Sequence, residues 1–321
     1  MSNEFKAVPP LASLSPRERY EQVLGIAVPI ILALTSQNLL NIVDTWIVGR
    51  LGSLALAAVA LSATINWVLS SFFIGLGSGV QAYTARRVGE GDDAGTAAAL
   101  NRCLRFVLTA VVPMALVASF VSDDLLAAIS SRDDVVLTGT PYLASRLAGI
   151  PFLAANFAFR GYWNGLGLSK IYLRTILVIH ASNVAISYVL VFGAFGFPEW
   201  GVFGAGVGST AAQAVGTTYY IFLARRVGAT GEFLRGRTST LRELLRLGAP
   251  AGLQTVAFSS AFLIFFAITD RVGARELGAS HVLVTMALVS ILPAVGFGLG
   301  CASLVGQALG AERPEDARTW G

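Results

Sequence analysis

Residues 28–61 read VPIILALTSQNLLNIVDTWIVGRLGSLALAAVAL, and this stretch decides the fold. Its charged residues are Asp44 and Arg50, and most of the others are apolar. A helix needs about 20 mostly apolar residues to cross the hydrocarbon core of a membrane. The strands of a membrane barrel would instead alternate polar and apolar residues, which this stretch does not do. We therefore predict a membrane-spanning helix over 22–47 and a second one over 55–80.

The same apolar pattern continues along the chain. Charged residues make up 13% of the 321 residues, about half the share of roughly 25% in soluble proteins, and the mean hydropathy is +0.67. This composition excludes a disordered chain, a disulfide scaffold and an ordinary soluble enzyme. We predict an all-α integral membrane protein, a polytopic helical bundle, whose further spans cover 103–121, 137–159, 171–195, 202–224, 247–269 and 278–304.

Basic residues set the orientation of these predicted spans. Most of the 23 Lys and Arg residues fall on the side that holds both termini. Cytoplasmic loops carry the excess of Lys and Arg, so we predict a multi-pass protein of the inner (plasma) membrane with both termini in the cytoplasm. We interpret the Arg-rich loop 225–246 as contacting anionic membrane lipid and not nucleic acid. The outer side holds Arg50, Arg132, Arg146, Arg271 and Arg275.

An internal repeat organises the chain. A shift of 221 residues places Pro29 on Pro250 and Arg50 on Arg271, and it places the run Gly75, Gly77, Gly79 on Gly296, Gly298, Gly300. Six spans precede the second copy, so both copies enter the membrane in the same direction. We predict an N-terminal lobe of six helices over 1–224, an inter-lobe loop over 225–246 and the start of a C-terminal lobe over 247–321. That second copy has two of its expected six helices.

Four segments resemble one transporter family. Residues 28–61 resemble the first helix of multidrug and toxic compound extrusion (MATE) transporters, and the first-helix aspartate resembles the DinF-like branch. Similar resemblances are carried by FRGYWNGLGLSK (159–170), SYVLVFGAFGFPEWGVFGAGVGSTAAQ (187–213) and FGLGCASLVGQALGAERPEDAR (297–318). The resemblance implies two six-helix lobes around a cavity that opens alternately to each side. It also implies export of small organic cations, driven by inward flow of H⁺ or Na⁺. Family members have twelve helices, so the last four are missing here; we expect a monomer at full length.

Asp44 is the main candidate for the transport chemistry. Helical spacing places Gln37, Asn41 and Asp44 on one face, and a charge in hydrocarbon costs several kcal/mol and therefore usually serves a function. Burial disfavours an ionised carboxyl group, so Asp44 would take a proton from outside and release it inside, in competition with an organic cation. The resemblance adds that relatives use an aspartate 15 residues after a first-helix proline, as Asp44 follows Pro29. The alternative is an acid that reaches water or pairs with Arg50.

Other spans offer further candidates. Pro29 predicts a kink, and we interpret it as a hinge that responds to protonation of Asp44. In the fifth span His180, Asn183 and Ser187 share a face. Many relatives carry Asp or Asn four residues after this asparagine, where this chain has Ser187, so the resemblance implies that Asn183 is a neutral hydrogen-bond partner and not part of an acidic pair with Asp44. We expect His180 to act as a proton relay or as a helix–helix hydrogen-bond donor. In the sixth span Thr210, Gln213 and Thr217 form a stripe that we interpret as interhelical hydrogen bonding.

The acidic residues and motifs of the predicted spans bear on the coupling ion and on the alternative functions. Sodium-coupled relatives carry a seventh-helix glutamate where this chain has Phe258, which favours H⁺ over Na⁺. We expect no cofactor, no metal and no enzyme, since catalytic and nucleotide motifs are missing and the glycine runs are interpreted as helix packing. The alternatives are a flippase for a lipid-linked precursor, which needs a strongly basic cavity, and a truncated product that does not transport.

Overall fold

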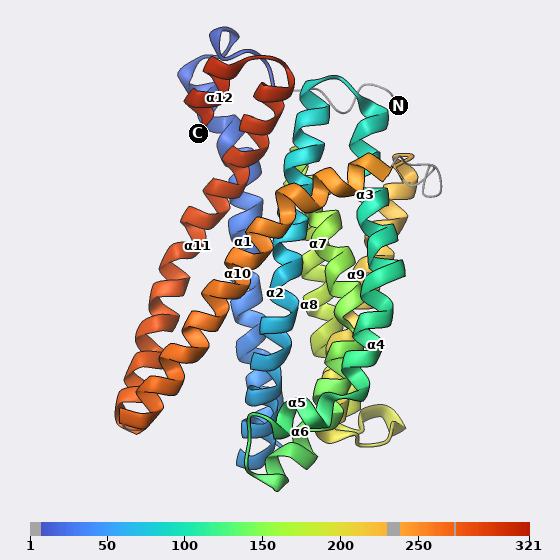
Figure 1. Cartoon of the computed structure of the whole chain (residues 1–321), viewed down its shortest axis with the longest axis vertical. Helices are drawn as coiled ribbons and strands as arrows, with labels where there is room; N and C mark the ends of the chain where they lie inside the picture. The colour runs from blue at the N-terminus through green and yellow to red at the C-terminus, as the bar shows by residue number, and fades with distance from the viewer. Residues whose placement is uncertain (1–7, 230–237, 273) are drawn as a thin grey trace.

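The computed structural model describes residues 8–229, 238–272 and 274–321 and is a bundle of long helices (Figure 1). The long helices of the first part are α1 (Pro16–Gly49), α2 (Ser53–Gly89), α3 (Asp93–Phe106), α4 (Val112–Phe120), α6 (Asp133–Ala148), α7 (Ile150–Gly165), α8 (Ser169–Phe192) and α9 (Gly201–Arg226). Two more follow, α10 (Thr238–Val272) and α11 (Ala274–Gly310). The short elements are η1 (Leu11–Ser13), η2 (Val107–Val111), α5 (Ser122–Ala127), η3 (Ala194–Gly196) and α12 (Pro314–Trp320).

The predicted fold class, a polytopic helical bundle, is confirmed. Each of the eight predicted spans coincides with a long helix or with two joined helices, and five helical segments of the described chain are by themselves long and apolar enough to cross a membrane. The third span is α3 and α4 joined by the π-helical turn η2. The fourth is α6 and α7, which meet at Gly149, just before Pro151. Proline lacks a backbone donor and prefers the first turn of a helix, which explains why a new helix begins there.

The helices extend beyond their predicted apolar segments because polar residues cap their ends. Ser15 and Glu18 form a reciprocal capping box at the start of α1, which satisfies backbone donors that a helix start leaves open. Asp92 caps α3 in a similar way by accepting from the backbone N–H of Gly95. α10 begins at Thr238, inside the predicted loop 225–246, and its Leu244 is buried, with the carbonyl oxygen beside Gly79 of α2. Residues 230–237 of that loop lie outside the described residues.

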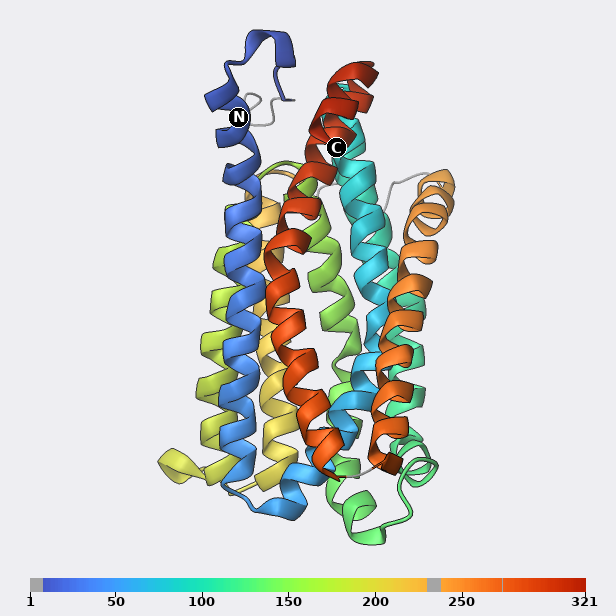
Figure 2. The same ribbon diagram turned by 90° about the vertical axis from the view of Figure 1, so that its left-hand side faces the viewer.

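The start of α1 and the helix α12 lie at the same end of the bundle, which we call the terminal face (Figure 1). The other end, where α6 begins, is the opposite face. α7 fills the centre of the first part, with Phe159, Tyr162 and Trp163 buried in its core. Figure 2 shows α11 between α1 and α2, and α10 packs on the other side of α2.

Glycines let α2 and α11 approach their neighbours closely, and their contacts repeat. A Cβ atom at Gly75 of α2 would collide with the backbone of Gly252 in α10. A Cβ atom at Gly296 of α11 would collide with Ile31 in α1. The 221-residue shift converts Gly75 into position 296 and Ile31 into position 252, so the two contacts are copies of each other. The contact of Gly79 with Gly248 and that of Gly300 with Ala27 are related in the same way.

In one pair of glycine contacts, the 221-residue shift turns each contact into the other. A Cβ atom at Gly89 would collide with the carbonyl oxygen of Gln307, and one at Gly310 would collide with the carbonyl oxygen of Arg86. The shift of 221 residues places Gly89 on Gly310 and Arg86 on Gln307, so the second contact is the counterpart of the first. The predicted parallel repeat is therefore present in the packing, with its two-fold axis passing between Gly89 and Gly310 near the terminal face.

Candidate functional site

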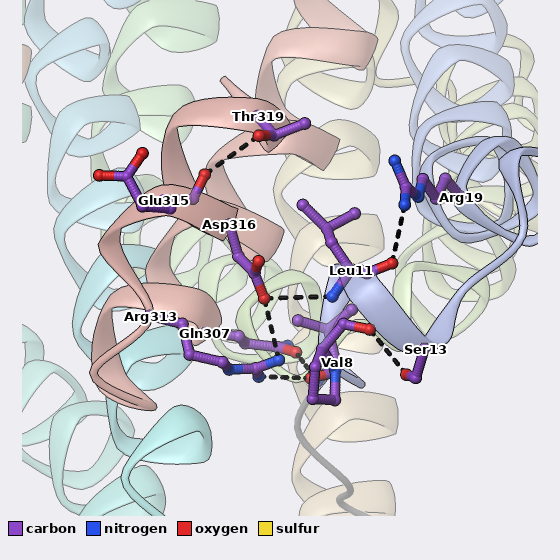
Figure 3. A network of polar contacts seen from close by, with 10 residues as sticks. Val8, Leu11, Ser13, Arg19, Gln307, Arg313, Glu315, Asp316 and Thr319 are labelled. Carbon is purple, nitrogen blue, oxygen red and sulfur yellow. Dashed lines mark hydrogen bonds and ion pairs between the residues drawn. The ribbon is translucent and has the colours of Figure 1, made fainter.

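The terminal face is closed by an N-terminal strap (Val8–Leu14) that lies against α11 and α12 (Figure 3). Val8 donates from its backbone N–H to Gln307 Oε1 at 3.0 Å and accepts from Arg313 at 2.6 Å. The backbone N–H of Leu11 donates to Asp316 Oδ2 at 3.1 Å. Val8 and Leu11 are buried in one cluster with Trp320. The strap therefore joins the two ends of the chain by both polar and apolar contacts.

Two glutamine side chains strengthen this closure beneath the strap. Gln307 of α11 donates from Nε2 to the carbonyl oxygen of Gly165, at the end of α7, at 3.0 Å. Gln81 of α2 donates to Leu299 O at 2.7 Å and to Ser303 Oγ at 2.9 Å, both in α11. A cavity of about 870 Å³ remains beside the strap and is lined in part by α1, α8 and Gln307. Beneath the strap these hydrogen bonds therefore join α11 to α2 and α7.

The predicted polar stripe of α1 begins at the half-buried Gln37 and continues to Asn41, which is exposed. Gln37 donates from Nε2 to Asn41 Oδ1 at 3.2 Å, as expected for side chains four residues apart on one helix face. Gln37 Oε1 also lies 3.2 Å from Nε2 of His180, which reaches across from α8. The structure thus brings together three of the sequence-predicted residues, Gln37, Asn41 and His180, in one hydrogen-bonded group.

Asp44 continues this stripe toward the opposite face and is half-buried. The positive charge of Arg146 in α6 acts on it electrostatically, without an ion pair between the two among the described residues. Arg50, the partner considered from the sequence, instead lies over the ring of Trp46, 5.4 Å from its centre. In the described part of the chain, Asp44 forms no ion pair with Arg50. Arg146 of α6, and not Arg50, is therefore the charge to consider at this site.

Sequence reasoning missed the significance of Arg146. It was assigned to the outer side with the loop arginines, although it lies inside the predicted span 137–159. A basic residue within an apolar span was the signal that could have identified it. In the structure its Nε atom is buried and has no hydrogen-bond partner among the described residues.

The candidates of α8 and α9 face each other. Asn183 donates to Ser209 Oγ at 3.1 Å, so the contact that the structure gives this side chain runs to α9 and not to Asp44. Ser187 packs against Gly208 of α9. These contacts join α8 and α9 along the face that the sequence predicted to be polar.

The stripe of α9 binds α6 and α7, which confirms the interpretation as interhelical hydrogen bonding. Thr210 donates to Ser145 O at 2.8 Å. Asn156 of α7 donates to Gln213 Oε1 at 2.7 Å and accepts from Thr217 at 3.0 Å. Asn156 was not among the sequence candidates, although a lone amide in the apolar stretch 147–159 was a usable signal.

The remaining candidates lie outside this polar group. Pro29 is buried inside α1, and its repeat counterpart Pro250 lies inside α10. Phe258 of α10 is exposed, and its ring packs on Phe262 with ring centres 4.9 Å apart. The described residues hold no group of three or more His, Cys, Asp or Glu side chains that could bind a metal ion. Cys103 and Cys301 are free thiols.

Comparison with known proteins gives consistent results. Probable multidrug resistance protein YoeA of Bacillus subtilis (strain 168) is 27% identical over 293 residues, which cover 88% of this chain and 63% of the relative. Multidrug resistance protein PmpM of Pseudomonas aeruginosa is 27% identical over 319 residues, covering 97% and 67% of the two chains. This chain therefore spans about two thirds of the length of these relatives.

Solved structures show the same fold. An outward-facing multidrug resistance MATE family transporter of the MOP superfamily superposes with a TM-score of 0.85 at 21% identity, covering 94% of this chain and 67% of the other. A MOP superfamily transporter from Pyrococcus furiosus superposes with a TM-score of 0.81 at 19% identity, covering 94% of this chain and 67% of the other.

The MatE family model matches the chain twice, over residues 29–189 and 250–320. The two matches begin at Pro29 and Pro250, the prolines that the 221-residue shift places on each other. The family model thus identifies the same repeat as the packing of the glycines. The chain therefore belongs to the multidrug and toxic compound extrusion (MATE) family of membrane transporters.

Proposed function

We propose that this chain exports small organic cations across the inner membrane in exchange for protons, by alternating access. The observation that carries the proposal is the polar stripe of α1, in which the half-buried Gln37 hydrogen-bonds with Asn41 and with His180 of α8, and the half-buried acid Asp44 follows about one turn further along. An acid in such a setting is expensive and usually functional. The relatives named multidrug resistance proteins support export as the direction of transport.

In this mechanism Asp44 binds either a proton or the cationic cargo. Burial disfavours the ionised carboxylate, so a proton arriving from the outer side neutralises Asp44 and releases the cargo. When the proton leaves toward the cytoplasm, the carboxylate regains its charge and binds the next cation. Because one carboxylate serves both ligands, inward movement of protons is coupled to outward movement of cargo.

Alternating access requires the terminal face to open. We assign the terminal face to the cytoplasmic side, because the predicted loops on that side carry most of the Lys and Arg residues. The strap and the glycine contacts close that side here. Cargo from the cytoplasm then enters when α1 and α2 separate from α10 and α11, with bending at the buried Pro29 as the movement in α1.

The proposal predicts that Asp44→Asn abolishes proton-driven export. Asparagine keeps the size and polarity of the side chain but carries no charge and does not titrate, so it cannot exchange a proton for a cation. The measurement is uptake of ethidium into everted membrane vesicles that contain the 321-residue chain and are energised with a proton gradient. Repeating the assay with a sodium gradient separates the two coupling ions.

Asp134→Asn is the matched control, because Asp134 is an acid at the start of α6 that pairs with the exposed Arg132 at 2.7 Å. We expect this variant to transport ethidium like the unmodified chain. Wild-type ethidium transport by Asp44→Asn would remove Asp44 from the coupling mechanism. Transport driven equally by a sodium gradient would overturn the assignment of H⁺ as the coupling ion.

A further inference from the structure

Arg146 is a basic residue within the fourth span, and the proposed function gives it no role. It follows the first residue of α6 by 13 positions, about 20 Å along the helix. It is half-buried, and its Nε atom is buried without a hydrogen-bond partner in the described chain. A buried polar group without a partner costs free energy, so this position demands an explanation.

The packing of α6 determines the direction in which Arg146 points. Gly139 of α6 packs on Ser62 of α2, and Tyr142 of α6 packs on Gly206 of α9. Arg146 follows Gly139 by seven residues and Tyr142 by four, so on the helix surface it lies between the face toward α2 and the face toward α9. α1 contacts both of those helices. Arg146 is therefore directed toward α1 across the interior.

Asp44 lies at the same level of the bundle as Arg146. Ile47 and Val48 of α1 are buried in the same cluster as Tyr142. Asp44 lies one turn from Val48 and Arg146 one turn from Tyr142, and both turns lead toward the terminal face because α1 and α6 run in opposite directions (Figure 1). The electrostatics agree, because Asp44 interacts with Arg146 and Tyr142 interacts with both.

The two opposite charges act on each other without forming a direct pair. Among the described residues, neither side chain forms a hydrogen bond or an ion pair within 4.0 Å. Such an arrangement differs from a structural salt bridge, in which hydrogen bonds would satisfy both groups. It leaves the carboxylate accessible while a positive charge remains close enough to act on it.

We propose that Arg146 is a positioning residue that serves as the resident counter-cation of Asp44 and sets the pH at which Asp44 exchanges a proton for cargo. This inference rests on the proposed role of Asp44. A nearby positive charge favours an ionised carboxyl group, so Arg146 keeps the empty site ready for a cation. The guanidinium also opposes a second positive charge in the site, which promotes release when the proton arrives.

The other groups around Asp44 are neutral, distant or separately bound. His180 of α8 contacts the stripe through Gln37, and Arg50 lies over Trp46. α9 contributes Ser209, Thr210 and Gln213, which titrate at no pH of interest and hydrogen-bond to α8, α6 and α7. α2 contributes two apolar residues: Ala55 lies in the cluster that also holds Ile47, Val48 and Tyr142, and Val59 packs against that cluster. The charge to vary is therefore that of Arg146.

The test is equilibrium binding of tetraphenylphosphonium to the purified 321-residue chain as a function of pH. This probe is permanently charged, so every pH dependence of its binding belongs to the protein. Without the guanidinium the carboxyl group ionises less readily, so Arg146→Met should move the pH midpoint of binding upward by about one unit or more. Arg146→Lys keeps the positive charge and should bind with a midpoint close to that of the unmodified chain.

Controls separate this effect from general damage. Arg50→Gln removes the arginine that follows α1 and lies over Trp46, and it should leave the midpoint unchanged. His180→Gln should leave the shift caused by Arg146→Met intact. Where Arg146→Met does not fold, Arg146→Gln takes its place, because it keeps a long polar side chain without the charge. Saturable binding at high pH shows that the Arg146 variants are folded.

Three outcomes are informative. A raised midpoint in Arg146→Met that is restored in Arg146→Lys supports the inference. An unchanged midpoint in Arg146→Met, together with loss of pH dependence in Asp44→Asn, overturns the role of Arg146 and leaves the proposed function intact. A pH dependence that survives unchanged in Asp44→Asn overturns both, because the titrating group is then a different one.

Discussion

At the scale of single residues, glycines that look equivalent in the sequence have different surroundings. A Cβ atom at Gly161 of α7 would collide with the carbonyl oxygen of Gly77 in α2, whereas one at Gly298 of α11 would meet nothing within 4 Å. We predict that Gly161→Ala lowers the free energy of unfolding by about 1–3 kcal/mol, because two backbones must separate. Thermal unfolding in detergent measures this change.

Gly298→Ala is the matched control, since it adds the same methyl group at a helix position with open space. Alanine loses less conformational freedom than glycine on helix formation, so this variant should be unchanged or more stable by roughly 0.5–1 kcal/mol. Equal destabilisation by both substitutions would contradict close approach at Gly161 as the cause.

Individual polar residues show how far spacing alone can predict a site. The i, i+4 relation of Gln37 and Asn41 is a property of one helix, and the hydrogen bond between them could be predicted from it. The partners of Asn183 and Arg146 come from other helices. Their identity depends on how those helices are rotated against each other, which a residue-by-residue reading does not determine. Asp44 was therefore identified, but not the charge that faces it.

At the scale of elements, the strap is held by hydrogen bonds to side chains at the far end of the chain. Asp316 of α12 accepts from the backbone N–H of Leu11 and pairs with Arg313 at 3.2 Å. We predict that Asp316→Ala accelerates amide hydrogen exchange in the strap about tenfold or more, because a hydrogen bond to a charged acceptor contributes about 1.5–3 kcal/mol. Exchange measured by mass spectrometry on peptides that cover residues 8–14 reports the change.

Glu315→Ala provides the comparison for this experiment. Glu315 is the neighbouring acid in the same short helix and pairs at 3.1 Å with Arg318, and both side chains are exposed. Removing an exposed pair has little energetic effect, so the strap should exchange as in the unmodified chain. Equal acceleration by both variants would mean that α12 itself has unfolded.

The spans and the strap differ in how predictable they were. An apolar run of sufficient length forms a span wherever it lies, because the hydrocarbon of the membrane imposes that structure. The strap depends on contacts between positions 299 and 305 residues apart in the chain. No local pattern in residues 8–14 indicates those partners. α5 and α12 are likewise too short to give a periodic signal.

At the scale of the whole molecule, the two-fold axis relates the glycine contacts but not the residues they meet. Gly75 approaches the backbone of Gly252, whereas its counterpart Gly296 approaches first the side chain of Ile31. A side chain can change its rotamer, but a helix backbone cannot move without carrying its neighbours along. The two halves of the interface therefore have the same positions, but they differ in how well they accommodate an added side-chain atom.

This inequality predicts different effects of one substitution at symmetric positions. Gly75→Ala should lower the free energy of unfolding by about 1–3 kcal/mol, since α2 and α10 must move apart. Gly296→Ala should cost less than about 1.5 kcal/mol, because Ile31 can repack around the added methyl group. Thermal unfolding of the two variants, beside Gly298→Ala as a neutral reference, measures the difference. A larger loss for Gly296→Ala would show that α1, and not α10, is the more rigid partner across the axis.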